Sequence, residues 1–398
     1  MPLNNCFQHQ LYPTEPSTLP VLRTLECTDG ATGEFAALHT SLRVGRVVLV
    51  HGTFMGDDPL GFAEMLKSVG QGVPLLRATM EALAQRLVER TRLTSSSLAG
   101  DLGNFTPAFR DKFQSLVGDD PRVELLEPTW SSQNHHLARA DLAVRLLDQL
   151  LRRPLPGDQR ILLWGHSHAG NAFALLTNLL ANDKATVAKF FDAAGDQPGA
   201  HWKAVRESLQ SASSPHPLAK SVLIAEFETP VRYGWDTAGH AGLVHVTFHR
   251  PFDLSQPFRA KPMFPPHPLN DVMNATWGDW VQAFAIAGTD VSSMPSISVN
   301  QRLSALLEAN LPEPEHGFDT RLISPRQVRD VCGRWKTGTR CHADGLNVLV
   351  DYKPSGELTA IGRPIELSLL GHGVATTVKW LPAHLKLVLE QLSRTPVS

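Results

Sequence analysis

Short apolar runs that end in turn residues recur along this chain of 398 residues, and they constrain its fold more than any other feature. Such runs are typical of strands that are buried on both faces of a parallel sheet. Amphipathic helical patterns lie between several of them, as at Leu142, Leu146 and Leu150. The alternation predicts an α/β fold with a mostly parallel central sheet and helices on both faces. The runs are 46–50, 122–128, 161–164, 221–228, 281–288 and 346–350.

Two segments do not follow this alternation. Residues 54–120 carry helical patterns where one crossover helix would suffice, and residues 229–280 contain a proline cluster with little periodicity. We interpret residues 1–398 as a single domain in which the helical insertion 54–120 and the proline-rich segment 229–280 form a cap. Residues 30–44 are expected to add one or two antiparallel edge strands before the main sheet. The helical patterns of the first segment lie at 61–69, 76–92 and 105–117.

The composition is that of an ordinary globular protein, with 42% hydrophobic and 19% charged residues and a formal net charge of −2. This balance gives no sign of nucleic acid or an anionic membrane surface as the main partner. The first thirty residues do not resemble a signal peptide, and no apolar stretch approaches the ~18 residues that span a bilayer. We therefore expect a soluble, cytoplasmic protein with no transmembrane segment. The four cysteines form no Cys-x-x-Cys pair. A disulfide bridge between Cys332 and Cys341 remains an alternative.

The stretch 161–176, "ILLWGHSHAGNAFALL", takes an apolar strand through a turn of small residues into an apolar helix. A sharp strand-to-helix turn forces its central residue, Ser167, into strained backbone geometry and raises its hydroxyl above the sheet. The residues two positions before Ser167 and two or three positions after it must then be small, because larger side chains would collide there. Gly165, Ala169 and Gly170 meet this requirement. The start of the helix also directs backbone N–H groups at an oxyanion formed there. The pattern therefore favours a serine nucleophile.

Two other interpretations of this turn remain open. Ser167 could be an ordinary turn residue whose neighbouring glycines allow tight packing. Alternatively, His166 and His168 could form part of a metal site, but no acidic ligand follows closely, since the next residues are Ala169, Gly170 and Asn171. We favour the nucleophile and expect no metal and no organic cofactor.

The "GHSHAG" turn after a strand, together with "VVLVHGTF" upstream, resembles the α/β-hydrolase superfamily of lipases and esterases. The usual motif of that family is Gly-x-Ser-x-Gly, and here Ala169 stands at the last glycine, with Gly170 one position later. The resemblance in element order covers residues 40–398. It implies a catalytic triad in the chain order serine, acid, histidine.

The resemblance implies that His372 is the base, because "LLGHGVATT" follows the last predicted strand and precedes the terminal helix. The acid is less well defined. Asp290, at the end of the run "FAIAGTD", matches the family position, and Asp351, at the end of "LNVLVDY", is its rival, with Asp236 as a further alternative.

The oxyanion hole needs two backbone donors. The resemblance assigns these to the N–H of His168, the residue after the nucleophile, and to that of Thr53 in "HGTF", with Phe54 as second choice. Alternatively, Gly52 only permits a tight turn. The stretch 129–139, "TWSSQNHHLAR", follows a strand and either lines the pocket or caps the next helix.

We therefore expect a serine hydrolase that cleaves carboxylic esters through a covalent acyl-enzyme, with a small-molecule ester or acyl substrate. Acyl transfer, or thioester or amide hydrolysis, would use the same triad. A non-catalytic binding protein of this fold would use the scaffold alone, and it would have an unreactive Ser167.

Overall fold

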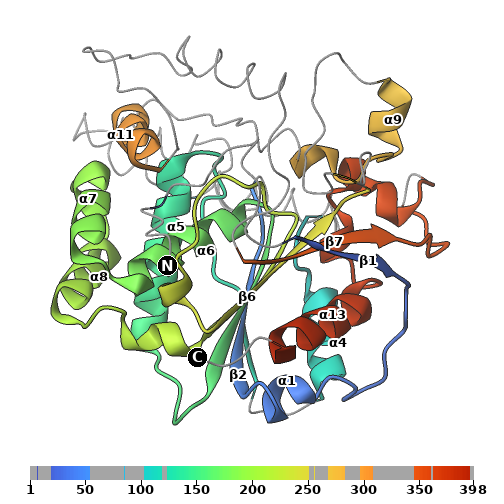
Figure 1. The fold of residues 1–398 in the computed structure, drawn as a ribbon, viewed down its shortest axis with the longest axis horizontal. Coiled ribbons are helices and arrows are strands. Elements are labelled where there is room, and N and C mark those ends of the chain that lie inside the picture. The colour runs from blue at the N-terminus through green and yellow to red at the C-terminus, as the bar shows by residue number, and fades with distance from the viewer. Residues whose placement is uncertain are drawn as a thin grey trace.

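The structure, a computed structural model, contains a seven-stranded sheet in which every strand pairs in parallel with its neighbours (Figure 1). Across the sheet the order is β1-β7-β6-β5-β4-β2-β3. The strands are β1 (Val21–Leu25), β2 (Val44–Val50), β3 (Glu124–Leu126), β4 (Arg160–His166), β5 (Val222–Phe227), β6 (Gly242–Phe248) and β7 (Leu346–Tyr352). The residues that the structure describes are 7, 19–53, 85, 103–118, 123–250, 255, 268–282, 296–307, 345–359 and 362–394.

Most of the predicted strands are confirmed, since the runs at 46–50, 122–128, 161–164, 221–228 and 346–350 correspond to β2, β3, β4, β5 and β7. Two expectations are wrong, and a third, the strand at 281–288, falls mostly outside the described residues. The antiparallel edge strands expected at 30–44 are absent from this described stretch, which holds the short helix α1 (Ala37–Thr40), and the edge strand is the parallel β1. Strand β6 lies inside the segment assigned to the cap. At 281–288, Val281 and Gln282 are helical, and the remainder lies outside the described residues.

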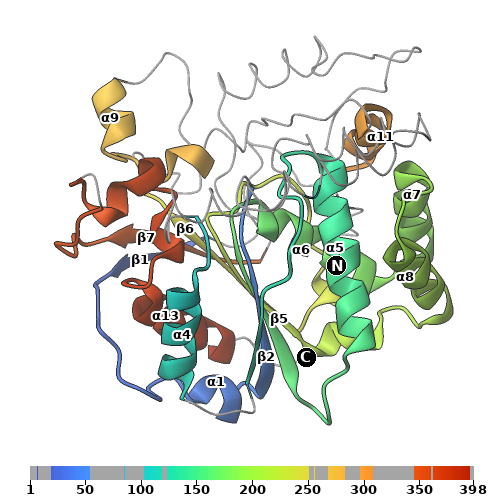
Figure 2. The same ribbon diagram turned by 180° about the vertical axis from the view of Figure 1, so that it is seen from behind.

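Helices cover both faces of the sheet, as predicted (Figures 1 and 2). One face carries α5 (His136–Arg152), α6 (His168–Ala181), α7 (Lys184–Ala194), α8 (Ala200–Ser211) and α11 (Ile297–Leu307). The other face carries α1, α4 (Pro107–Val117) and α13 (Leu381–Arg394), of which α4 and α13 match predicted helical patterns. The short helix α9 (Leu269–Met273) lies near the carboxyl end of β7 in Figure 1.

Both faces of the central strands are buried, which explains their continuous apolar sequences. In β4, Ile161 and Leu163 pack into the core beneath α5 and α6, whereas Leu162 and Trp164 pack into the core beneath α4 and α13. Successive side chains of a strand point to opposite faces, so one apolar run supplies both cores.

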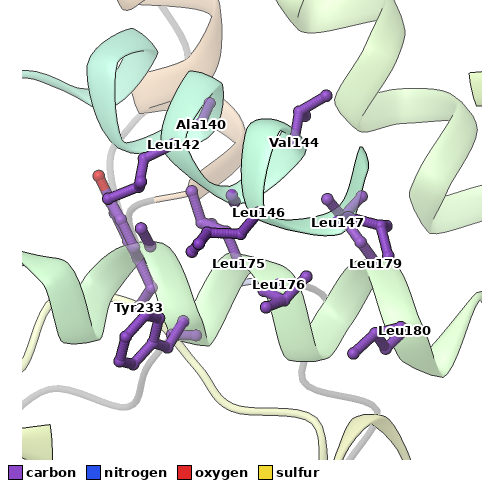
Figure 3. Close-up of a cluster of buried hydrophobic side chains, with 14 of the residues drawn as sticks. Ala140, Leu142, Val144, Leu146, Leu147, Leu175, Leu176, Leu179, Leu180 and Tyr233 are labelled. Carbon is purple, nitrogen blue, oxygen red and sulfur yellow. The ribbon is translucent and has the colours of Figure 1, made fainter. Parts of the chain in front are cut away.

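The core beneath α5 and α6 is built from leucines on the facing sides of these two helices (Figure 3). Leu146 of α5 and Leu176 of α6 are at most 1% exposed, and both lie in the cluster drawn there. Because α6 begins at the serine turn, this packing fixes the helix that follows Ser167.

The predicted cap segments are only partly described. Of residues 54–120, Gln85 and residues 103–118 are described, and these include α4. The helical patterns at 61–69 and at most of 76–92 lie outside the described residues, as do Cys332 and Cys341. A search of the described helices found none that is both long enough and apolar enough to cross a membrane.

We predict that Leu146→Ala lowers the free energy of unfolding by about 2–5 kcal/mol, because it leaves a cavity between α5 and α6. Leu269→Ala is the matched control, since Leu269 is 74% exposed on α9, and it should change stability by less than about 0.5 kcal/mol. Denaturant unfolding followed by circular dichroism measures both. Equal effects of the two variants would contradict the packing described for α5 and α6.

Candidate active site

The serine turn lies at the point where the strand order of the sheet reverses. After β2 the chain goes to β3 on one side, and it then returns to form β4 on the other side of β2. Loops at such a point leave the sheet in opposite directions and open a crevice in which ligands bind. Gly52 follows β2 and Ser167 follows β4, and a Cβ built on Gly52 would lie 2.6 Å from the Cβ of Ser167. The two loops that the sequence analysis assigned to one site are therefore in contact.

Ser167 has the backbone geometry that the sharp turn demands. Its φ of 57° and ψ of −135° lie in a region that residues other than glycine rarely adopt, at a cost of about 1–3 kcal/mol. It stands at the N-cap position of α6, where a serine usually accepts a hydrogen bond from the helix, yet its side chain makes no such bond. The simple interpretation of Ser167 as a helix-capping turn residue therefore does not explain this conformation.

Close packing holds the turn in place. The N–H of Ser167 donates to the carbonyl of Phe227 at 2.8 Å, and the hydroxyl of Thr229 donates to the carbonyl of Ser167 at 2.9 Å. A Cβ on Gly165 would lie 2.4 Å from the ring of Phe173, and a Cβ on Gly170 would lie 2.0 Å from Oγ1 of Thr229. The small residues on both sides of Ser167 are thus required by sterics, as the sequence analysis argued.

His372 approaches this turn from the loop before α13, and its ring is paired with a carboxylate. Its Nδ1–H donates to Oδ2 of Asp279 at 2.5 Å. Both side chains are almost fully buried, His372 at 6% and Asp279 at 1% exposure. Oδ1 of Asp279 accepts from the N–H of Gln282 at 2.9 Å, so both carboxylate oxygens have donors. The arrangement fixes the orientation of the imidazole.

Asp279 reaches His372 because the chain returns to the end of β6. An antiparallel bridge joins His249 to Gly278, and the N–H of Asp279 donates to the carbonyl of Phe248 at 3.0 Å. Asp279 therefore occupies the carboxyl end of β6, the strand next to β7, although it lies 31 residues after Phe248, the last residue of β6.

The structure places the other candidate acids differently. Asp290, the first choice, lies outside the described residues. The carboxylate of Asp351 is 46% exposed and accepts from Nε of Arg250 at 2.7 Å. Asp236 accepts from the N–H of Ala238 in a turn. The described carboxylate bonded to His372 is thus Asp279, which the sequence analysis did not consider.

His166 lies directly beside His372. Its Nε2–H donates to the carbonyl of His372 at 2.9 Å, and the centres of the two rings are 4.6 Å apart. Burial, followed by the proximity of His372, lowers the pKa of His166 well below its usual value. A neutral His166 therefore connects the serine turn to the histidine loop, since it immediately precedes Ser167.

His166 and His168 do not point to one metal site. The ring of His168 contacts Asn171 through Nδ1 at 3.1 Å, whereas His166 bonds to His372. Within the described part of the chain, no group of three or more His, Cys, Asp or Glu side chains is arranged to hold a metal ion.

The predicted oxyanion residues lie on the two loops that meet at Ser167. His168 is the first residue of α6, and Thr53 follows Gly52 on the loop after β2. Phe54 lies outside the described residues. Both of the predicted loops thus adjoin Ser167.

The stretch 129–139 supplies the N-terminal cap of α5. Serine and asparagine are typical capping residues, but the cap here is His135. Nδ1 of His135 accepts from the N–H of Ala138 at the start of α5. Asn134 instead accepts from Arg139, and Trp130 donates through its indole N–H to the carbonyl of His51 at 3.2 Å. This hydrogen bond from Trp130 therefore stabilises the loop that contains Gly52.

Comparisons of the chain with protein-family models, with curated proteins and with solved structures found no match.

We predict that Gly170→Ala destabilises the protein by about 1–3 kcal/mol, because its Cβ would overlap the side chain of Thr229. Thr229→Ala removes Oγ1 and Cγ2, the two closest atoms, so the double variant should lose less stability than the sum of the single variants. Denaturant unfolding of the two single variants and the double variant measures this coupling. Strict additivity would contradict the close contact between Gly170 and Thr229.

Proposed function

We propose that this protein is a serine hydrolase of the α/β-hydrolase fold that cleaves carboxylic esters. The observation that carries the proposal is the strained backbone of Ser167 beside a histidine–aspartate pair. His166, which precedes Ser167, donates a hydrogen bond to the carbonyl of His372. The ring of His372 is in turn bonded to the buried Asp279. Backbone strain at a residue other than glycine is concentrated at functional sites.

The order of the groups supports the same proposal. Ser167 follows β4, Asp279 lies at the end of β6, and His372 follows β7. This is the chain order serine, acid, histidine that characterises α/β-hydrolases. All three groups lie at the carboxyl ends of parallel strands, the edge of such a sheet where ligands bind.

In the proposed mechanism, Oγ of Ser167 attacks the carbonyl carbon of the ester. His372 takes the hydroxyl proton through Nε2, since Nδ1 is bonded to Asp279, and later passes it to the leaving alcohol. Asp279 keeps the imidazole in the required tautomer and stabilises its charged form. Water then attacks the acyl-enzyme while His372 takes a proton from it. His372 passes that proton to Oγ of Ser167 as the carboxylic acid leaves.

The tetrahedral oxyanion needs two hydrogen-bond donors. We assign them to the backbone N–H groups of His168 and Thr53, because His168 directly follows Ser167 and Thr53 directly follows Gly52, which lies against Ser167. The positive end of the α6 dipole also favours a negative charge at this point. Acyl transfer, or thioester or amide hydrolysis, would use the same groups, and it differs only in the attacking or leaving group.

We predict that a fluorophosphonate probe adds once to the parent protein and does not add to Ser167→Ala, as intact mass spectrometry would measure. Ser221→Ala is the matched control and should keep the adduct, because Ser221 lies at the start of β5, at the opposite end of the sheet, and donates to Leu218. No adduct on a folded parent protein would contradict the proposal and favour a non-catalytic binding protein.

We predict that Asp279→Asn lowers kcat for a p-nitrophenyl ester by about 10⁴-fold, because an amide holds the imidazole in the wrong tautomer. Asp351→Asn should leave kcat unchanged, since that carboxylate binds Arg250. Asp290→Asn is the decisive comparison. A large loss in Asp290→Asn with little loss in Asp279→Asn would show that the assignment of Asp279 is wrong.

A further inference from the structure

A second buried carboxyl group, Glu228, lies against Asp279. Glu228 follows β5 and is 0% exposed, and its carboxyl group lies within hydrogen-bonding reach of that of Asp279, which is 1% exposed. The N–H of Phe248 donates to both carboxyl oxygens of Glu228 at 3.0 Å, and the carbonyl of Phe248 accepts from the N–H of Asp279. One residue of β6 thus anchors both acids.

Two carboxyl groups in hydrogen-bond contact away from water cannot both be ionised. An ionised carboxylate only accepts hydrogen bonds, so a bond between two carboxyl groups needs a proton on one of them. Asp279 faces the imidazole of His372 through Oδ2 and the N–H of Gln282 through Oδ1, and both partners are donors. The shared proton therefore belongs on Glu228.

The surroundings of Glu228 agree with this placement of the proton. Burial, followed by the charge of Asp279, raises the pKa of Glu228 well above its usual value. Glu226, which precedes it by two residues on β5, adds a further negative neighbour and is itself paired with His245.

Tyr352 on β7, a further titratable neighbour in the described part of the chain, brings no positive charge to this pair. Burial, followed by the charges of Glu228 and Asp279, raises the pKa of Tyr352 well above its usual value, so its hydroxyl stays neutral. That hydroxyl contacts Nε2 of His384 at 2.9 Å, and burial lowers the pKa of His384 to about 3. His384 is therefore also neutral at the pH at which an ester hydrolase works.

We propose that Glu228 is a positioning residue of the active site: it stays protonated and donates a hydrogen bond to Asp279, which keeps Asp279 ionised and aimed at His372. The inference rests on the proposed function, because the position of Asp279 matters only if His372 acts as a base. Glu228 itself touches neither substrate nor nucleophile. It acts through Asp279 alone.

Infrared spectroscopy at neutral pH tests the proton directly and needs no catalytic activity. The parent protein should show the C=O stretch of a buried protonated carboxyl group, and Glu228→Gln should lack it. Glu366→Gln is the matched control and should keep the band, because the buried Glu366 is held by the N–H donors of Ser355 and Trp380 rather than by a second acid. A parent protein without this band would overturn the proposal.

The pH profile of kcat/KM for a p-nitrophenyl ester tests the role. Glu228→Gln keeps a neutral donor to Asp279 and an acceptor for Phe248, so kcat/KM should stay within about 3-fold and the acidic limb should not move. Glu228→Leu removes both bonds and should lower kcat/KM by roughly 10- to 100-fold, as expected when a buried charged acceptor loses its donor.

If Glu228 were ionised instead, the acidic limb of the pH profile would move in Glu228→Gln. Glu228→Gln would then remove a negative charge close to the imidazole, and the acidic limb would move down by about one pH unit. That shift, or equal losses in Glu228→Gln and Glu228→Leu, would overturn the proposal. Failure of Ser167 to react with the fluorophosphonate would instead overturn the proposed function and leave the infrared result standing.

Discussion

Three consecutive residues at the end of β5, Phe227–Thr229, hold the serine turn on one side and the acidic groups on the other. The carbonyl of Phe227 and the hydroxyl of Thr229 bond to the backbone of Ser167. Between them, Glu228 adopts a positive φ of 56° and turns its carboxyl group toward Phe248 and Asp279. The carbonyl of Thr229 also accepts from the side chain of Gln282, whose N–H binds Asp279. A displacement of this short segment would therefore disturb Ser167 and Asp279 together.

Several buried polar groups meet at this edge of the sheet, and directed hydrogen bonds offset the cost of burying them. Asp279 accepts from Gln282 and His372, and Glu226 accepts from the N–H of Thr229 at 3.2 Å. Most of these donors are backbone N–H groups near the ends of β5 and β6. Such fixed dipoles need little rearrangement when charge develops on an imidazole, which is the property that an active site requires.

Sequence patterns predicted the local structure around Ser167, because the strand and the helix on its two sides are both evident from neighbouring residues. They did not predict that Asp279 pairs with His372. The position of Asp279 is set by the bridge between His249 and Gly278, which brings a distant segment back to the sheet. Strand β6 was missed for a related reason: His245 interrupts its apolar run, and the partner that helps to offset its burial, Glu226, lies on the adjacent strand.

The edge strand β1 has a consequence for how the protein is made. Among the described strands β1 pairs with β7 alone, and Val21 lies opposite Val348. Strand β1 can therefore pair only after β7 has been synthesised, whereas the strands between them in the chain can pair with one another earlier. Contacts between such distant parts of a chain form slowly. An incomplete chain would therefore leave β1 unpaired and the open edge of β6 exposed, a surface on which strands of other chains can add.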